Sequence, residues 1–476
     1  MEEKIQQTKK PEEDESIITY AWSCKGCGST IKTIENKQPN NCSCGIKEFE
    51  YLGFKYREDL IKSAGDKFKS PKIIEMIKEE IGKYHLGDDN LKMTMFLIEV
   101  SGLLNNQKRR QSLAITSESS EGKDNMIRST LKQIPNNAFM FLTKATQATI
   151  EDDMSDIRII AFSEVNAGRE NGSNKDLIET IKQKTEGGTD SIKKDLRDGM
   201  KSARREKSEQ ASVIYGTTET GMDEEMRSRF ICGGIKTDVK RIKRVNDNTL
   251  DSISDLDKLL SDSKDVDNWV RIGLNGFFNK EEQFEVWIPY AKFLKEVEGE
   301  IIFDNNDARS QRDLKRILGL TCAMTYVRQL QRKTKDYKGT SILISEPEDF
   351  IDTLKITQEF FNQSYTGIDH RLSEVINAME DITKETGKVW IARIEIQKKI
   401  GKVLNTIKEY CKELGLSEGK GLIEGRPGFK LREEIPGSDY NIKQTYYRKA
   451  EQPIKRELIY GELDKILIFL NGKMSE

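Results

Sequence analysis

Short apolar runs alternate with amphipathic segments through the middle of the chain, and this alternation predicts an α/β fold. The runs at 112–116, 156–162 and 211–216 have the length and composition of buried strands. Segment 125–134 follows the first run and carries apolar residues at the spacing of one helix face. We therefore expect strands whose polar carboxyl-terminal tips meet at one edge of a sheet.

Helical patterns flank this region on both sides. Apolar residues at helical spacing predict an amphipathic helix at 73–81 and a more buried one at 90–104. His85 lies between them, and we interpret it as a surface or packing residue rather than a ligand. Segments 313–332 and 345–361 predict two further helices.

The last third of the chain predicts a separate small domain. Segments 389–401 and 404–415 predict a short strand and two helices, and 422–434 predicts two short strands around the turn Gly-Arg-Pro-Gly. This order resembles a winged helix, whose second helix and wing either contact duplex DNA or dock proteins. Segment 454–473 predicts a final amphipathic helix that packs back onto the body or mediates assembly.

Four cysteines near the N-terminus have the spacing of a metal site. Cys24 and Cys27 form CKGC, and Cys42 and Cys44 form CSC. Two close pairs on two turns can surround a zinc ion with four thiolates, and neighbouring glycines ease such turns. The pattern predicts a zinc ribbon, with structural thiols or a redox pair as the alternative. The other cysteines are expected to be buried and without a chemical role: Cys232, Cys322 and Cys411.

Residues 116–125 read TSESSEGKDN and resemble a phosphate-binding loop with two positions exchanged. In the pattern G-x-x-x-x-G-K-[ST], a serine replaces the first glycine and an aspartate replaces the hydroxyl residue. Such a loop works between a buried strand and a helix, because backbone N–H groups and the helix N-terminus then surround the anion. We expect the nucleotide to contact these residues: Ser117, Ser119, Ser120, Glu121, Gly122, Lys123, Asp124 and Asn125.

The second predicted strand ends in Ser163 and Glu164, where P-loop ATPases carry two acidic residues. Glu164 stands at the position that polarises the attacking water. Mg²⁺ in such sites takes the loop hydroxyl and is held by the first acid. We hypothesise that Asp124 and Ser163 have exchanged these two roles around one magnesium ion. The alternative is a site that binds nucleotide but hydrolyses it poorly.

Composition limits the other choices. A chain of 476 residues is too long for one compact core. Its net charge of −2 gives no global attraction to a polyanion, so a nucleic-acid surface has to be local. No apolar run reaches the roughly 18 residues that span a bilayer, and the charged start lacks the apolar centre of a secretion signal. We therefore expect a cytoplasmic, intracellular protein without membrane contact.

In order, the motifs SESSEGKD, IIAFSEV, VIYGTTET and EEMRSRF resemble those of AAA+ ATPases, in particular minichromosome-maintenance-like replicative helicases of archaea, plasmids and viruses. The resemblance covers roughly residues 80–350. It implies that Arg229 is an arginine finger acting on a neighbouring subunit, with Arg227 as the alternative. It also implies that Arg312, in SQRDLKRIL, is the sensor 2 residue. From the sequence, the arginines of EEMRSRF are expected close to the tip of the third strand.

The resemblance further implies a β-hairpin that grips DNA in a ring channel, just before a sensor 1 residue that is here Thr217 or Thr218. Residues 191–210 fit the hairpin, and Gly199 favours its turn; a solvated helix face is the alternative. Basic side chains there would neutralise phosphates irrespective of sequence. They are Lys193, Lys194, Arg197, Lys201, Arg204 and Arg205.

The expected organisation is an α/β protein with an AAA+ P-loop core and accessory modules. The segments are a disordered tail (1–19), the zinc ribbon (20–52), a helical segment (53–105), the ATPase core (106–245), a helical lid region (246–380), the winged helix (385–435) and a tail helix (436–476).

The resemblance implies an ATP- and Mg²⁺-dependent DNA helicase or translocase of replication. It is expected to form a ring, as a hexamer, on single-stranded or forked DNA, with Zn²⁺ in its ribbon and replication proteins as partners. One alternative is a replication initiator or loader that ATP switches. The other is a catalytically weak DNA-binding regulator.

Overall fold

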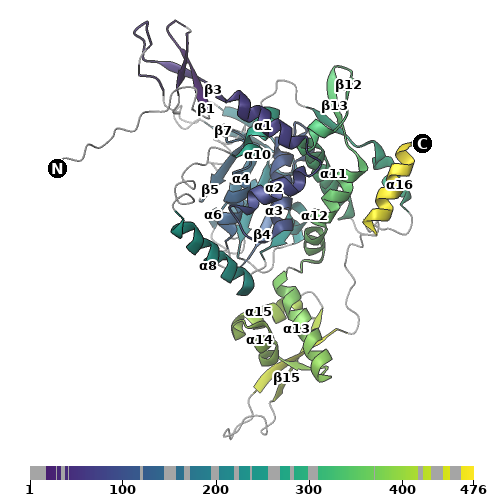
Figure 1. The fold of residues 1–476 in the computed structure, drawn as a ribbon. Helices are drawn as coiled ribbons and strands as arrows, with labels where there is room; N and C mark the ends of the chain where they lie inside the picture. Colours follow the sequence, from purple (N-terminus) through teal and green to yellow (C-terminus); the bar gives the residue numbers. More distant parts are fainter. Residues whose placement is uncertain are drawn as a thin grey trace, which may run out of the picture.

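A five-stranded parallel sheet lies at the centre of the largest part of the protein (Figure 1). In spatial order its strands are β10 (Ile231–Gly234), β4 (Leu113–Thr116), β9 (Ser212–Thr217), β6 (Ile159–Phe162) and β5 (Phe139–Leu142). Every neighbouring pair is parallel, so all five strands end at one edge, called here the carboxyl edge, and begin at the opposite amino edge. The predicted strands at 112–116, 156–162 and 211–216 are confirmed.

The structure is a computed structural model, and the description covers most of the chain. The described residues are 18–27, 29–33, 38–40, 42–117, 122–143, 157–165, 172–194, 203–218, 224–235, 239–255, 268–278, 284–297, 309–368, 370–415, 422–429, 443–450 and 462–475. The expected tail at 1–19 lies outside them, except for its last two residues, which begin the first strand.

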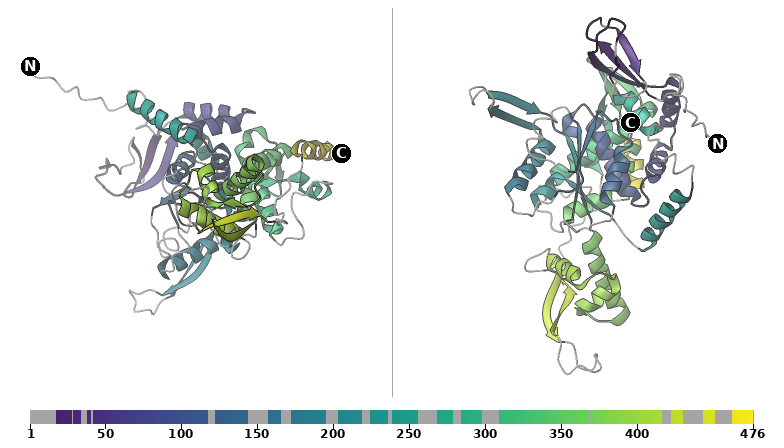
Figure 2. Two further views of the ribbon diagram at one scale, coloured as in Figure 1. Left: turned by 90° about the horizontal axis from the view of Figure 1, so that it is seen from below. Right: turned by 90° about the vertical axis from the view of Figure 1, so that its left-hand side faces the viewer.

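Helices cover both faces of the central sheet (Figure 2). Strand side chains alternate between two cores, because Leu113 and Ile115 pack on one face whereas Ala114 packs on the other. The first face is covered by α3 (Asp89–Leu103), α4 (Lys123–Leu131), α11 (Ser310–Val327) and α12 (Pro347–Thr366). The second face is covered by α6 (Gly172–Glu186) and α7 (Glu224–Arg229).

Segments from both ends of the chain join the larger core. α1 (Glu58–Phe68) packs on α10 (Trp269–Phe278), where the Phe68 ring meets Trp269 edge to face at 5.5 Å between centroids. α2 (Ile73–Gly82) packs on α3, so the expected helical segment 53–105 belongs to the same body as the sheet. α16 (Leu463–Ser475) packs on α12 and the 3₁₀ segment η4 (Pro289–Glu296), as one of the two predicted outcomes for the tail helix.

A small second sheet lies beside α11 and α12. Its strands are β11 (Glu285–Trp287), β13 (Thr340–Ile344) and β12 (Thr334–Tyr337), and β13 leads directly into α12. β10 leads to α8 (Val239–Ser254), which projects from the body (Figure 1). Four apolar side chains of α8 are exposed: Ile242, Val245, Leu250 and Ile253.

The C-terminal module has a core of its own. It contains α13 (His370–Thr386), α14 (Arg393–Ile400), α15 (Leu404–Leu414) and a sheet of β14 (Ile391–Ala392), β16 (Lys443–Lys449) and β15 (Ile423–Phe429). α13 was expected in the lid region, but it packs on α14 and α15, which extends the module to 370–450.

One turn prediction in this module is wrong. Gly-Arg-Pro-Gly at 425–428 lies within β15, which pairs with β16 over its whole length. Because β15 is an edge strand, the missing N–H of Pro427 breaks no ladder between two neighbours. Gly425 lies against the ring of Tyr447, and a Cβ there would be 3.1 Å from Cε1 of that ring.

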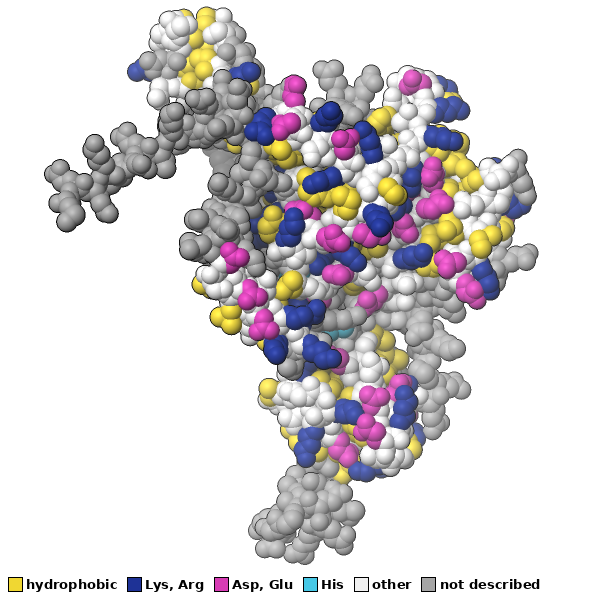
Figure 3. Space-filling model, in the orientation of Figure 1, with side chains coloured by type: hydrophobic (Ala, Val, Ile, Leu, Met, Phe, Trp, Pro, Cys, Tyr) yellow, Lys and Arg dark blue, Asp and Glu magenta, His cyan; other side chains and the backbone are white. Residues whose placement is uncertain are grey.

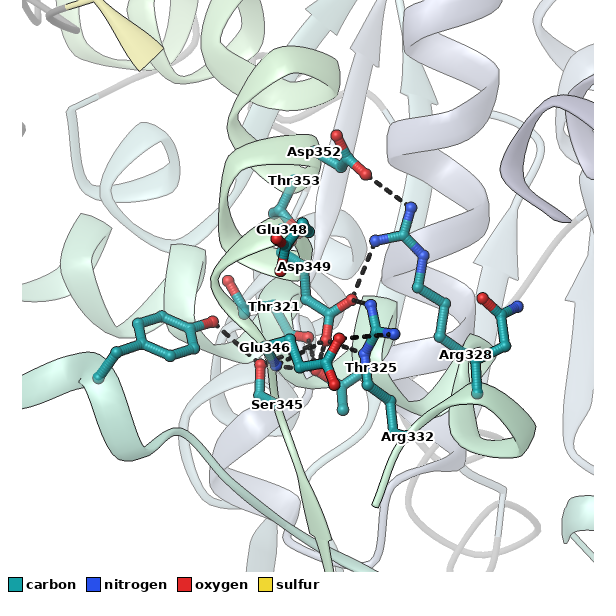
Figure 4. A network of polar contacts seen from close by, with 12 residues as sticks. Thr321, Thr325, Arg328, Arg332, Ser345, Glu346, Glu348, Asp349, Asp352 and Thr353 are labelled. Carbon is teal, nitrogen blue, oxygen red and sulfur yellow. Dashed lines mark hydrogen bonds and ion pairs between the residues drawn. The ribbon is translucent and has the colours of Figure 1, made fainter. Parts of the chain in front are cut away.

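A buried carboxylate joins the elements beside the second sheet (Figure 4). Asp349, in the first turn of α12, has no exposed surface and binds Arg332 through both oxygens, at 2.6 and 2.9 Å. The same carboxylate accepts from Arg328 at 2.9 Å and from Thr325 of α11 at 3.0 Å. Since burial alone would raise the pKa of Asp349, these arginines must outweigh it, and they hold that pKa below its usual value.

No described helix combines the length and the apolar content that crossing a bilayer requires.

We expect Asp349→Asn to lower the free energy of unfolding by about 3–5 kcal/mol, because two arginines would lose the charge that compensates their burial. Asp352 is the matched control, since it pairs with Arg328 at 2.6 Å but is one-third exposed. Asp352→Asn should cost about 1 kcal/mol or less. Urea unfolding followed by tryptophan fluorescence measures both, and equal costs would contradict this role of Asp349.

Candidate functional site

The carboxyl edge of the sheet brings Asp124 and Ser163 together. Asp124 lies in the first turn of α4, and Ser163 directly follows β6. The Ser163 hydroxyl donates a hydrogen bond to Oδ2 of Asp124 at 2.7 Å, although the residues are 39 positions apart in sequence. The exchange hypothesis requires this proximity.

Lys123 lies next to this pair, over the backbone of β9. Its side chain is buried, and its Nζ donates to the carbonyl of Ser117 at 3.3 Å. Gly122 precedes α4 with φ of 90°, a conformation that favours glycine. A Cβ at Gly216 of β9 would lie 3.2 Å from Cδ of Lys123 and 2.5 Å from the carbonyl oxygen of Ser163. Only glycine therefore lets β9 pass this close to both residues.

Glu164 contacts one of the two sensor 1 candidates. The Thr218 hydroxyl donates to Oε1 of Glu164 at 3.2 Å. Thr217 is buried instead, and its carbonyl accepts from the N–H of Ser117 at 3.2 Å. Thr218 is therefore in contact with the predicted catalytic carboxylate. The loop residues Ser119, Ser120 and Glu121 lie outside the described part of the chain.

The donor set at Asp124 and Ser163 suits magnesium. Mg²⁺ prefers hard oxygen ligands, keeps several waters and takes one or two carboxylates from the protein. One carboxylate and one hydroxyl meet here, and a second carboxylate follows at Glu164. The residues therefore fit such an ion.

A cavity of about 360 Å³ opens beside the start of α4. Its size falls in the range of small-molecule sites, and its lining mixes apolar and polar groups. It lies between the segment before α3, the end of the loop and α8, and its lining includes Tyr84, His85, Leu86, Gly122, Asn125, Arg241, Ile242 and Val245.

His85 belongs to a buried polar network in this cavity wall. Its Nδ1 lies 3.3 Å from Nδ2 of Asn125, and Arg241 approaches its Nε2 at 3.1 Å. Arg241 also pairs with Asp88 at 2.8 Å, which ties α8 to the segment before α3. Of the two roles that the sequence interpretation gave His85, surface or packing residue, the structure shows the second, although its polar partners were not predicted. The only local indication of this network in the sequence was that His85 lies two residues before Gly-Asp-Asp. The partner Arg241 could not be recognised, because it is 156 residues away.

The predicted arginines lie at the amino edge, not at the strand tips where the sequence placed them. Arg229 comes two residues before β10, whose first residue pairs with the first residue of β4. The four residues of β10 then span about 13 Å before the carboxyl edge is reached. Arg229 is therefore separated from Lys123 of its own chain by the length of the sheet.

The start of α11 binds the end of α7 at this amino edge. Arg309 donates to the carbonyl of Arg227 at 3.1 Å, and Arg316 donates to the carbonyl of Ser228. Such cations satisfy carbonyls left free at a helix C-terminus. Arg312 binds the Ser228 hydroxyl, so the finger and sensor 2 candidates are neighbours.

The predicted hairpin is present. β7 (Thr189–Lys194) and β8 (Ala203–Ser208) form an antiparallel pair, with Lys193 opposite Arg204 and Ile192 opposite Arg205, rather than the alternative helix. It projects from the body on the side away from α8 (Figure 2). Arg197 and Lys201 lie outside the described residues.

The four N-terminal cysteines form a second candidate site. β1 (Ile18–Cys24), β2 (Thr30–Thr33) and β3 (Phe49–Tyr56) make a small antiparallel sheet beside two turns. The four Sγ atoms lie within 4.8 Å of one another, and two pairs are 3.5 Å apart. Tetrahedral zinc with bonds of about 2.3 Å places its sulfurs about 3.8 Å apart. The cluster therefore fits zinc.

Local hydrogen bonds favour the thiolate form of one of these cysteines. The backbone N–H of Cys44 and the hydroxyl of Ser29 lower the pKa of Cys42 to about 5. A thiolate is the form that binds metal. The remaining cysteines are buried as predicted: Cys232, Cys322 and Cys411.

Charge is evenly mixed on the face shown in Figure 3, where Lys and Arg side chains alternate with Asp and Glu. This distribution agrees with the near-zero net charge. Among its described residues, this face therefore has no broad basic patch that would attract nucleic acid.

A scan against models of known protein families finds no match for this chain, and a search of curated proteins finds no similar sequence.

We expect the purified chain to hold about one zinc ion, and Cys42→Ser to lose it, because four thiolates complete the tetrahedron. Chelation should also loosen the ribbon, whose described core contains little more than Cys24, Cys42 and Phe49. Metal analysis and limited proteolysis measure these effects. Cys232→Ser is the control and should keep the metal. Full zinc content in Cys42→Ser would refute the site.

Proposed function

We propose that this protein is an AAA+ ATPase that works as a ring-forming DNA helicase or translocase in replication. The observation that carries the proposal is the hydrogen bond between Asp124 and Ser163, next to buried Lys123. It supports a nucleotide site because loop, helix start and strand tip converge at the carboxyl edge of a parallel sheet, where ligands of such sheets bind.

Different residues of this edge bind the phosphates, bind the nucleoside and orient the attacking water. The start of α4 and Lys123 receive the phosphates, since backbone N–H groups and an ammonium favour negative charge. The cavity beside Gly122 receives the nucleoside, with Tyr84 and Ile242 as apolar walls. Glu164 orients the attacking water, and Thr218 holds the Glu164 carboxylate at 3.2 Å.

Asp124 and Ser163 would hold Mg²⁺. The ion would neutralise charge on the phosphate oxygens. The two residues supply the same ligand types as an ordinary loop hydroxyl and strand acid, from exchanged positions. Their hydrogen bond at 2.7 Å holds the two oxygens next to each other.

A second subunit completes the site. Arg229 and Arg312 lie at the amino edge, a strand length away from the phosphate loop of their own chain. An arginine that stabilises charge on the transferred phosphoryl group has to reach it directly. The arrangement therefore favours a ring in which each chain offers its amino edge to the next chain's loop.

Two elements are proposed to contact DNA. The β7–β8 hairpin carries paired basic positions, including Lys193 opposite Arg204, and projects from the body. The module at 370–450 combines three helices with a three-stranded sheet, and we propose that it acts as a winged helix with β15 and β16 as the wing. Phosphate contacts of this kind give binding that is independent of sequence and weakens with salt.

We expect DNA-stimulated ATP hydrolysis that Lys123→Ala and Arg229→Ala each lower by about 100-fold or more. Mixing the two inactive variants should restore about a quarter of wild-type turnover, since that fraction of interfaces pairs an intact loop with an intact arginine. Wild-type chain without Lys123-dependent turnover would refute the ATPase, and no recovery on mixing would refute the shared site. Displacement of a strand from forked DNA separates a helicase from a loader.

We further expect Asp124→Ala and Ser163→Ala to raise the Mg²⁺ concentration needed for half-maximal turnover. The exchanged double variant Asp124→Ser/Ser163→Asp should recover most activity, because it restores one carboxylate and one hydroxyl around the ion. Magnesium titrations of the turnover rate measure this. Full Mg²⁺-dependent activity in Asp124→Ala would exclude the proposed exchange.

A further inference from the structure

Five alternating charges connect three helices at the amino edge of the sheet. Lys182 of α6 pairs with Glu225 of α7, and Glu225 pairs in turn with Arg229. Arg229 also pairs with Glu186 at 3.2 Å, and Glu186 lies 3.8 Å from Arg312 of α11. Hydrogen bonds from Lys182 and Arg229 lower the pKa of Glu225 to about 2. Glu225 therefore stays charged over the physiological range.

Glu186 is the carboxylate that the two arginines share. The Arg229 side chain is only 15% exposed, so its guanidinium is held mainly by Glu186 and Glu225. The Arg312 side chain is 49% exposed and lies near the other carboxylate oxygen of Glu186, Oε1. The finger and sensor 2 candidates of one chain thus meet at a single acidic group.

Glu186 is also the last residue of the helix that enters the hairpin. Gly187 and Gly188 follow, and β7 begins at Thr189. Gly188 has φ of 82° and donates its N–H to the carbonyl of Gln183 at 3.1 Å, which turns the chain sharply from helix to strand. Only Gly187 and Gly188 therefore separate Glu186 from the first strand of the hairpin.

The second arm returns to the same place. After β8, the N–H of Ala211 donates to the carbonyl of Lys184 at 3.0 Å, and the side chain of Gln210 donates to the carbonyl of Thr185 at 2.9 Å. Both arms of the hairpin are therefore fixed to the last turn of α6. A movement of that turn moves the base of the hairpin.

We propose that Glu186 is a positioning residue that couples the two arginines to the hairpin. The inference rests on the proposed function. In the free chain Glu186 holds Arg229 and Arg312. When a neighbour's triphosphate approaches, its negative charge competes with the carboxylate for the same guanidinium groups, and the two anions repel each other. The arginines transfer to the phosphate, and the end of α6 and the hairpin base are released together.

The same exchange works in reverse. DNA that moves the hairpin shifts Glu186 and frees the arginines for the neighbour's phosphate. Linkage requires this reciprocity for binding, because each ligand favours the same state of the network. DNA stimulation of hydrolysis then follows from the removal of a competing carboxylate.

Glu186→Gln tests this coupling, and Glu179→Gln is the matched control. Glu179 lies on the same helix, is exposed and approaches Lys182 at 3.8 Å. We expect Glu186→Gln to raise DNA-independent turnover about fivefold or more and to bring the ratio of stimulated to basal turnover toward one. Glu179→Gln should behave as wild type. Exposed ion pairs contribute about 0–1 kcal/mol, so neither variant should unfold the chain.

Three outcomes separate the possibilities. Wild type without Lys123-dependent turnover removes the proposed function itself. If wild type is active but Glu186→Gln leaves basal and DNA-stimulated turnover unchanged, or lowers both equally, the coupling is refuted and the proposed ATPase activity is not. A second measurement is independent of turnover: amide hydrogen exchange of 189–208 should change when a non-hydrolysable ATP analogue is added to wild type, and not in Glu186→Gln. Equal changes in both proteins overturn the inference.

Discussion

The candidate site depends on one constraint, the close approach of β9 to the backbone of Ser163 and to the side chain of Lys123. Gly216 lets the strand pass within contact of both the Ser163 carbonyl and the Lys123 side chain, where any Cβ would collide with the former at 2.5 Å. The position of β9 thereby determines the distance between the start of α4, which carries Lys123 and Asp124, and Ser163 at the end of β6. Since Asp124 and Ser163 meet across this distance, a larger residue at 216 would push against the Ser163 carbonyl and part the two side chains.

Much of the arrangement could be predicted from local sequence, because strand tips of a parallel sheet share one edge. Apolar runs located β4, β6 and β9, and the order of strand, loop and helix located Lys123. The exchange of a hydroxyl and a carboxylate indicated that Asp124 and Ser163 act as a pair, and they lie in hydrogen-bond contact. The cysteine spacing likewise indicated a cluster that the fold assembles. The catalytic roles themselves stay predictions.

The rest depended on contacts between distant segments. His85 looked unremarkable because its partner Arg241 lies on α8. The turn at 425–428 was predicted from Gly and Pro alone, but β16 pairs with that stretch and makes it a strand. The arginines of α7 were expected near the strand tip that precedes them, whereas the parallel pairing of β10 requires the chain to return to the other edge first. Local propensity carries no information about such returns.

The position of α16 has a consequence for how the chain is made. Its Ile466 and Leu470 are buried in the larger core, yet they follow the separate module at 370–450 in sequence. In sequence, the module is thus inserted between segments of the larger body. Because it has a core of its own, it can fold before α16 has been synthesised. The α12 surface that contacts α16 therefore stays uncovered until residue 470 has been synthesised, so this part of the larger body is completed last during translation.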